Sequence, residues 1–182
     1  MKRLSALLLS VVWVFSGCVS DEENAQILFE RDIQKIETYV TQNPIASVKD
    51  AIDGSTGMRI YWTQLSGSGH KVALGDTVFV NYTGKLLNNS VFDTSNEATA
   101  KANNIFNANR DYEPLEFIIG RGMVIPGFEF AVFNMEKGDK ATVIMPSLYA
   151  YGSQGNGGIP PNSPLLFELE LVNIKDNPLA DD

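Results

Sequence analysis

Apolar and polar residues alternate in several short runs after residue 57, which is the spacing of half-buried β-strands. The clearest run is Leu165–Val172, where Glu168 and Glu170 stand between apolar residues. We therefore expect the apolar members of this run to point into a core; they are Leu165, Phe167, Leu169 and Leu171. Asp76–Lys85 alternates in the same way, and further strands are predicted at Met58–Leu65, Leu115–Ile119 and Ala141–Met145.

Two segments show helical spacing instead. Between Ala25 and Thr41, apolar residues recur at steps of 4, 3 and 4 positions, which places them on one face of a helix that Asn43-Pro44 ends. We expect this stripe to pack on the main domain or, alternatively, on a partner copy. A second, shorter helix is predicted at Phe128–Phe133, and Ile45–Gly57 is predicted to be a linker. The stripe consists of Phe29, Ile33, Ile36 and Val40.

Several antiparallel strands around one short helix predict an α+β domain. The chain has 182 residues, of which 44% are hydrophobic, so it can build a packed core. Its formal net charge is −8, and it contains no basic run or basic helix face. This balance argues against nucleic acid as a partner.

The first residues are typical of a signal peptide. Lys2 and Arg3 precede an apolar run, Leu4–Phe15, which is too short to span a bilayer but suits the apolar core of a signal peptide. The segment Phe15-Ser16-Gly17-Cys18 resembles the processing box of a bacterial lipoprotein, although Phe15 replaces the usual aliphatic residue. An ordinary signal peptide with an incidental cysteine is the alternative. The resemblance implies a lipid anchor on Cys18 and a place in the cell envelope at the outer membrane, on its periplasmic face or on the cell surface.

An acidic cluster follows this cysteine, in the segment Ser20-Asp21-Glu22-Glu23. It can act as a solvated spacer that favours the start of a helix, where negative charge is stabilised. It also resembles the surface-export signal of Bacteroidetes lipoproteins. Both interpretations remain open at this point.

Most common catalytic groups are missing from the chain. His70 is the sole histidine and Cys18 the sole cysteine, so no pair of these residues can hold a transition metal or activate a nucleophile. The glycine-rich segment Gly152–Gly158 lacks the Lys-Ser/Thr ending of a phosphate-binding loop and leads into Ile159-Pro160-Pro161. We therefore expect no metal and no cofactor.

Aromatic and aliphatic residues are concentrated in five segments that follow one another along the chain. In this order and at this spacing the segments resemble the FKBP-type peptidyl-prolyl cis-trans isomerases, the tacrolimus-binding immunophilins, here in a lipoprotein form similar to that of Bacteroidetes. The resemblance runs from about Thr56 to Ile174. The five segments are Val80–Gly84, Val91–Ser95, Gly120–Phe128, Tyr149–Gly152 and Gly158–Asn162, the last followed by Leu166–Leu171.

The resemblance implies a twisted antiparallel β-sheet wrapped around one short helix, with an apolar pocket between them. It implies proline-containing polypeptides as substrates and macrolides of the tacrolimus type as possible inhibitors. Carried over position by position, catalytic roles fall on Tyr82, Phe92, Asp93, Tyr151 and Phe167, and substrate-binding roles on Leu115, Val124, Ile125, Phe128 and Ile159.

Within this set the resemblance implies distinct roles. Phe128 would form the floor beneath the proline ring, at a place where many members carry tryptophan. The backbone amides of Ile125 and Ile159 and the hydroxyl of Tyr151 would bind substrate carbonyls. Asp93 would orient Tyr82 or interact with the polarised carbonyl. Such a pocket suits the reaction, because rotation about an X-Pro bond requires no acid, base or metal.

One insertion departs from the family pattern. Asn96–Glu113 is longer by about a dozen residues than the family leads us to expect. It is polar, with Ile105 and Phe106 as its sizeable apolar pair. It is either a surface expansion or a recognition element beside the pocket. The departures at Phe128 and in this insertion leave a second hypothesis open, a binding module or chaperone with weak catalysis; a structural envelope lipoprotein is a third.

The expected organisation has four parts. Residues 1–17 form the signal peptide, 18–57 the tether, helix and linker, 58–176 the isomerase domain, and 177–182 a short acidic tail.

Overall fold

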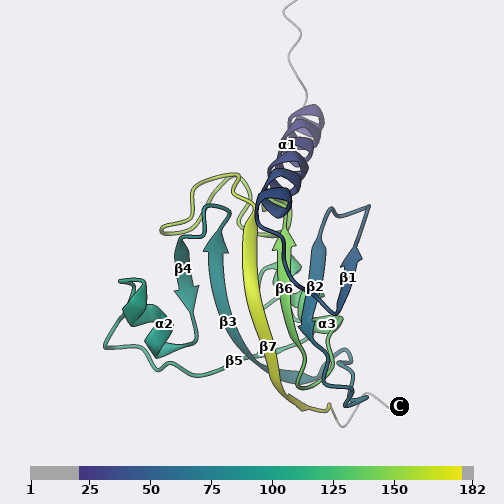
Figure 1. Cartoon of the computed structure of the whole chain (residues 1–182), viewed down its shortest axis with the longest axis vertical. Helices are drawn as coiled ribbons and strands as arrows, with labels where there is room; N and C mark the ends of the chain where they lie inside the picture. The colour runs from purple at the N-terminus through teal and green to yellow at the C-terminus, as the bar shows by residue number, and fades with distance from the viewer. Residues whose placement is uncertain (1–20, 178–182) are drawn as a thin grey trace, which may run out of the picture.

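The computed structural model describes residues 21–177 of the chain. Their main feature is a curved, antiparallel, seven-stranded sheet (Figure 1). The strand order is β1-β2-β6-β7-β3-β4, and β5 pairs with β3 beside this path. The strands are β1 (Lys49–Ile52), β2 (Arg59–Gln64), β3 (Thr77–Leu86), β4 (Val91–Thr94), β5 (Leu115–Ile118), β6 (Lys140–Met145) and β7 (Leu165–Lys175).

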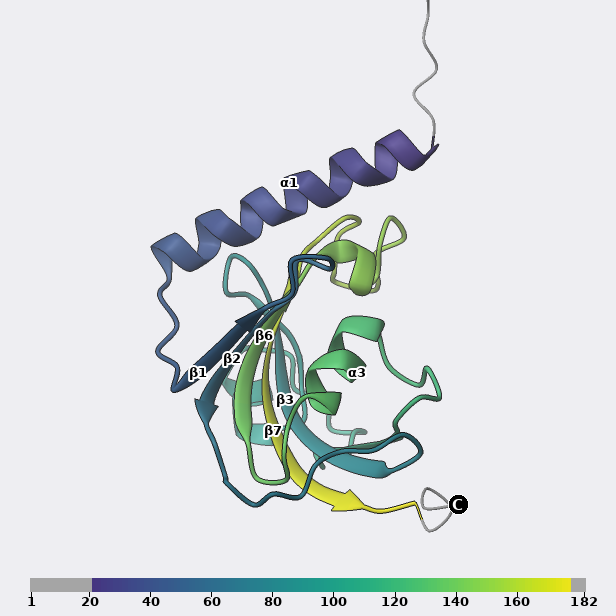
Figure 2. The same cartoon turned by 90° about the vertical axis from the view of Figure 1, so that its right-hand side faces the viewer.

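Helices lie on both sides of this sheet. Figure 2 shows the sheet curving around α3 (Pro126–Phe133), while α1 (Asp21–Gln42) crosses beyond one end of the strands. A short α2 (Glu97–Ala102) and a 3-10 turn, η1 (Ser147–Tyr149), complete the helical elements of the described residues. None of the helices within residues 21–177 is long and apolar enough to cross a membrane.

Strand β3 pairs with three other strands, more than any other strand of the sheet. It pairs along its whole length with β7, while β4 and β5 share its other edge. The predicted inward face of β3 is buried, with Val78, Val80 and Tyr82 between 0% and 9% exposed. The chain leaves this edge after β4 and returns at β5, so the polar insertion begins and ends beside Tyr82.

The main core lies between α3 and the concave face of the sheet. Phe128, Ala131 and Val132 of α3 are buried there, and the four apolar residues predicted to point inward from β7 are at most 4% exposed. A smaller cluster on the other face joins Ile36 and Tyr39 of α1 to apolar side chains of β6 and β7. Ala141–Met145 is buried at every position rather than at every second one, and on the face away from α3 it is α1 that covers Ile144.

The N-terminal helix therefore packs on the domain of its own chain. It begins at Asp21, before the predicted Ala25, so part of the predicted tether is helical. Ile36 of the predicted stripe is fully buried, and the other three members are partly buried. Two further buried side chains, Asp32 and Tyr39, were not part of that stripe, because a carboxylate and a phenol do not register as an apolar pattern.

Four short elements were not predicted, one of them the 3-10 turn η1. The segment expected to be a linker contains β1, which pairs with β2 although all four of its residues are exposed. Strand β4 and helix α2 were likewise missed. Elements of four to six residues at the edge of a fold carry too little periodicity to be recognised.

Candidate active site

A cavity of about 430 Å³ opens between the N-terminal end of α3 and the strands β3, β4 and β7. This volume is within the usual range for a small-ligand site, roughly 300–1,000 Å³. It is lined by Tyr82, Phe92, Asp93, Leu115, Met123, Val124, Ile125, Phe128, Tyr151 and Phe167. Nine of the ten predicted site residues are thus brought together.

Four aromatic rings form the apolar part of the cavity. Phe128 meets Tyr82 edge to face at a centroid distance of 5.8 Å, and it meets Phe167 in the same way at 5.3 Å. Phe92 packs on the other side of Phe167 at 5.6 Å. Edge-to-face pairs at these distances add to the stability that burial provides. The rings are therefore held in fixed orientations, with Phe128 only 3% exposed beneath the others.

The backbone of β3 approaches these rings closely. A Cβ atom added at Gly84 would lie 2.6 Å from Cζ of Phe92 and 2.8 Å from Cε1 of Phe167. Both distances are far inside van der Waals contact, so glycine at this position allows the two rings to approach the strand closely.

The polar edge of the cavity is a hydrogen-bonded group of three side chains. The Tyr82 hydroxyl donates to Oδ2 of Asp93 at 2.6 Å. Arg110 donates from Nη2 to the Tyr82 oxygen at 2.9 Å and from Nη1 to Oδ1 of Asp93. The Thr94 amide also donates to Oδ1 of Asp93, at 2.8 Å. Because both carboxylate oxygens are occupied, this geometry favours Asp93 as the group that orients Tyr82.

These contacts shift the pKa values of Tyr82 and Arg110. Burial, together with the hydrogen bond to Asp93 and its negative charge, raises the pKa of Tyr82 to about 12, against the opposing effect of Arg110. Burial lowers the pKa of Arg110, but its hydrogen bonds to Asp93 and Tyr82 outweigh burial and raise it overall. Near neutral pH the hydroxyl therefore keeps its proton and the guanidinium its charge, so the three groups remain linked.

Two predicted hydrogen-bond donors remain available to a ligand. Within residues 21–177, neither the Ile125 amide nor the Tyr151 hydroxyl donates to another group, and both residues line the cavity. The Ile159 amide was predicted to bind a substrate carbonyl, but it is already bonded within its own turn. It donates to the carbonyl oxygen of Asn156 at 2.8 Å, and the Ile159 side chain packs into the core beside the cavity without lining it.

Two residues of the site were missed from the sequence. Met123 lies within the recognised segment Gly120–Phe128, so its place at the rim could have been found there. Arg110 lies in the polar insertion, where no spacing marks it. The insertion is ordered around Phe106 and Tyr112, whose rings stack at 5.7 Å, and it delivers Arg110 to the pocket edge. Cys18 lies outside the described residues.

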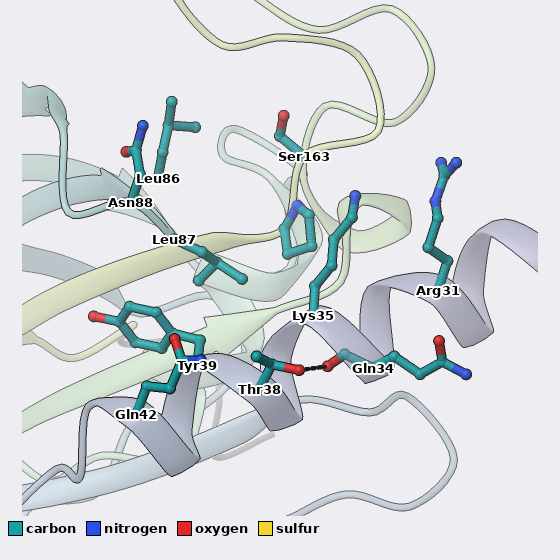
Figure 3. Close-up of a pocket in the computed structure, with 11 residues that line it drawn as sticks. Arg31, Gln34, Lys35, Thr38, Tyr39, Gln42, Leu86, Leu87, Asn88 and Ser163 are labelled. Atoms are coloured by element: carbon teal, nitrogen blue, oxygen red, sulfur yellow. Dashed lines mark hydrogen bonds between the residues drawn. The ribbon is translucent and has the colours of Figure 1, made fainter.

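A larger groove of about 590 Å³ lies elsewhere, between α1 and the turn after β3 (Figure 3). Its lining includes Arg31, Gln34, Lys35 and Tyr39 of α1, with Leu86 and Leu87 opposite. It holds a single aromatic ring, so it lacks the converging walls of the smaller cavity. Within residues 21–177, no three His, Cys, Asp or Glu side chains are grouped to hold a metal.

Comparison with known families identifies the domain. The sequence profile of the family described as FKBP-type peptidyl-prolyl cis-trans isomerase matches residues 69–172, more than half of the chain. The chain belongs to this family. The matched segment runs through β3 to β7, so it includes the whole FKBP-type cavity.

Individual members of the family support the assignment. The FKBP-type peptidyl-prolyl cis-trans isomerase FkpA of Escherichia coli K12 is 34% identical over 162 residues, which cover 88% of this chain and 54% of that protein. FK506-binding protein 2 of Yarrowia lipolytica is 41% identical over 108 residues, 59% of this chain and 66% of that protein. The chain thus spans about half of FkpA, and 28% of FK506-binding protein 4 of Gibberella zeae, which is also similar to it.

A solved structure shows the same fold. The peptidyl-prolyl cis-trans isomerase of Pseudomonas syringae pv. tomato superposes with a TM-score of 0.61 at 25% identity, covering 84% of this chain and 96% of that one. The FKBP-type fold predicted from the five segments is therefore confirmed.

Proposed function

We propose that this protein is a peptidyl-prolyl cis-trans isomerase that assists the folding of envelope or exported proteins. The observation that carries the proposal is the cavity closed by four rings, with two unoccupied donors at its mouth. Proline is an apolar ring next to a polar amide. A pocket of this construction can hold the ring and still bind the neighbouring carbonyl groups.

The chemistry requires little more than this geometry. Rotation about a peptide bond loses amide resonance, at a cost of about 18–20 kcal/mol. Uncatalysed X-Pro exchange takes roughly tens to hundreds of seconds. An apolar pocket disfavours the polar planar amide relative to its twisted form, and preferential binding of the twisted form lowers the barrier. In this proposal Phe128 supports the proline ring, while the Ile125 amide and the Tyr151 hydroxyl bind substrate carbonyls.

Replacement of Tyr151 by phenylalanine tests this assignment. In a protease-coupled assay on an X-Pro peptide, we expect the wild type to exceed the background rate and Tyr151→Phe to lower kcat/KM about fivefold, the value of one hydrogen bond. Tyr149→Phe is the matched control. It removes the same hydroxyl from a neighbour that does not line the cavity, so its kcat/KM should stay at the wild-type value.

Two results would contradict the enzyme assignment. Turnover by the wild type no faster than background would refute it. Tight binding of tacrolimus without turnover would instead support a binding module with the same pocket.

We also propose that the protein is a lipoprotein of the cell envelope, anchored in the outer membrane through Cys18. The proposal is supported by the basic and apolar residues that precede this cysteine and by the small residues directly before it. Two or more acyl chains give stable membrane attachment, whereas one binds only marginally. In this proposal residues 1–17 are removed, 18–57 connect the anchor to the domain, 58–176 form the isomerase domain and 177–182 its tail.

Fractionation of expressing cells tests the anchor. We expect the wild type to be recovered with membranes and to incorporate labelled fatty acid, and Cys18→Ser to do neither. Ser20→Ala, two positions away, should behave as the wild type. Membrane recovery of Cys18→Ser would contradict the proposal. Protease treatment of intact cells then distinguishes surface from periplasmic exposure.

A further inference from the structure

Helix α1 carries a carboxylate that is buried against the main domain. Asp32 is 1% exposed, and its Oδ2 accepts hydrogen bonds from the amide of Ser147, at 2.9 Å, and from the Ser147 hydroxyl. Its Oδ1 has no hydrogen-bond partner among the described residues but forms an ion pair with Lys35 at 3.5 Å. The helix is thus tied to a residue 115 positions later in the chain.

Docking of the helix does not itself require a charge at this position. Burying a carboxylate is costly, and a buried ion pair is often no more stabilising than apolar residues of similar volume. Ile36 and Tyr39 already provide an apolar contact with the sheet. The contribution of Asp32 therefore lies in what it holds, which is the backbone at Ser147.

Ser147 is the base of the turn that carries Tyr151. The Ser147 carbonyl accepts hydrogen bonds from the amides of Ala150, at 3.0 Å, and Gly152, at 2.8 Å. These two residues flank Tyr151 on either side, and Tyr151 lines the cavity. A shift of the Ser147 peptide would therefore move the Tyr151 side chain.

Helix α1 also touches the far end of the same loop. Lys35 donates to the carbonyl oxygen of Asn162 at 3.4 Å, and the Asn162 amide donates to the Gly152 carbonyl at 2.8 Å. Figure 3 shows the Lys35 side chain extending from α1 toward the segment that carries Ser163. Both ends of the loop are consequently held by neighbouring residues of one helix.

We propose that Asp32 is a positioning residue of the isomerase. Through Ser147 it holds the Tyr151 hydroxyl at the mouth of the pocket, so α1 contributes to the geometry of the active site. This rests on the proposed isomerase function. It assigns to the N-terminal helix a role in turnover, beyond connecting the domain to an anchor.

The test compares three changes in the full chain. We expect Asp32→Ala to lower kcat/KM about fivefold, as much as Tyr151→Phe does, because a displaced hydroxyl no longer binds the substrate carbonyl. Asp32→Asn keeps one oxygen for the Ser147 amide and should recover most of this loss. Gln34→Ala, an exposed change on the same helix, should leave kcat/KM at the wild-type value.

Two further measurements separate positioning from general loosening. Amide hydrogen exchange of residues 147–158 should become faster in Asp32→Ala, while exchange in β3 and β7 stays at the wild-type rate. In a Tyr151→Phe background, Asp32→Ala should lower kcat/KM less than about twofold further, because residues that act as one unit are not additive.

The outcomes are distinct. Unchanged exchange in residues 147–158, or the same loss of about fivefold in the Tyr151→Phe background, would overturn the proposal. A wild type without turnover would refute the proposed isomerase function, while the exchange measurement would still report whether Asp32 holds the loop.

Discussion

Replacing Phe128 with alanine is expected to remove nearly all isomerase activity and much of the stability of the domain. Phe128 is 3% exposed and packs edge to face against Tyr82, Phe117 and Phe167. Loss of a buried phenylalanine costs about 3–5 kcal/mol of unfolding free energy, partly through the cavity it leaves. Chemical denaturation measures the stability, and the peptide assay should show a fall in kcat/KM of about a hundredfold.

Two further variants distinguish the effect of Phe128 on the pocket from its effect on the stability of the core. Phe128→Leu keeps a large apolar side chain at this position, so it should cost less unfolding free energy than Phe128→Ala. It removes the flat ring, so we still expect kcat/KM to fall about tenfold. Phe133→Ala removes an exposed ring from the same helix and should change stability by no more than about 0.5 kcal/mol. Full turnover by Phe128→Leu would show that the ring is not the support for proline.

Replacing Gly84 with alanine is expected to damage the pocket with little change to the fold. The new methyl group would lie 2.6 Å from the Phe92 ring and 2.8 Å from the Phe167 ring, so at least one ring must move. Overpacking of this kind costs about 1–3 kcal/mol of stability. We expect KM for an X-Pro peptide to rise about tenfold, because a displaced wall narrows the cavity before substrate binds.

The control for this variant is Gly54→Ala, where an added Cβ meets no atom within 4 Å. It introduces the same side chain at a position that does not line the cavity and should leave KM at the wild-type value. If Gly84→Ala kept the wild-type KM and stability, the two rings would have to be more mobile than their close packing indicates.

Much of the sheet could be predicted because one side of most strands is buried. In β3, and in β7 from Phe167 to Leu171, the buried residues alternate, so the sequence shows the period directly. In β6 both faces are buried, so the short run Ala141–Met145 is apolar except for Thr142 and shows no alternation. Strand β1 could not be predicted, because its exposed residues are held by pairing with β2 alone.

The site could be predicted through motifs more than through any single residue. Each ring of the pocket alone would be an ordinary core residue, and the ordered set of segments indicated the family. Ile159 shows the limit of this inference. Its position was carried over, but its amide is already bonded to Asn156, a pairing that depends on the local turn.

The sequence by itself determined the α+β class, the main strands, the aromatic set and the family, because alternation and ordered motifs are local along the chain. Only the tertiary structure decided that Arg110 reaches Tyr82, 28 residues away, and that Asp32 reaches Ser147 across 115 residues. Contacts at such separations depend on how the elements pack, and single polar residues leave no periodic pattern from which to infer them. The place of Phe128 in the pocket could therefore be predicted from the sequence. The contacts of Arg110 with Tyr82 and of Asp32 with Ser147 could not.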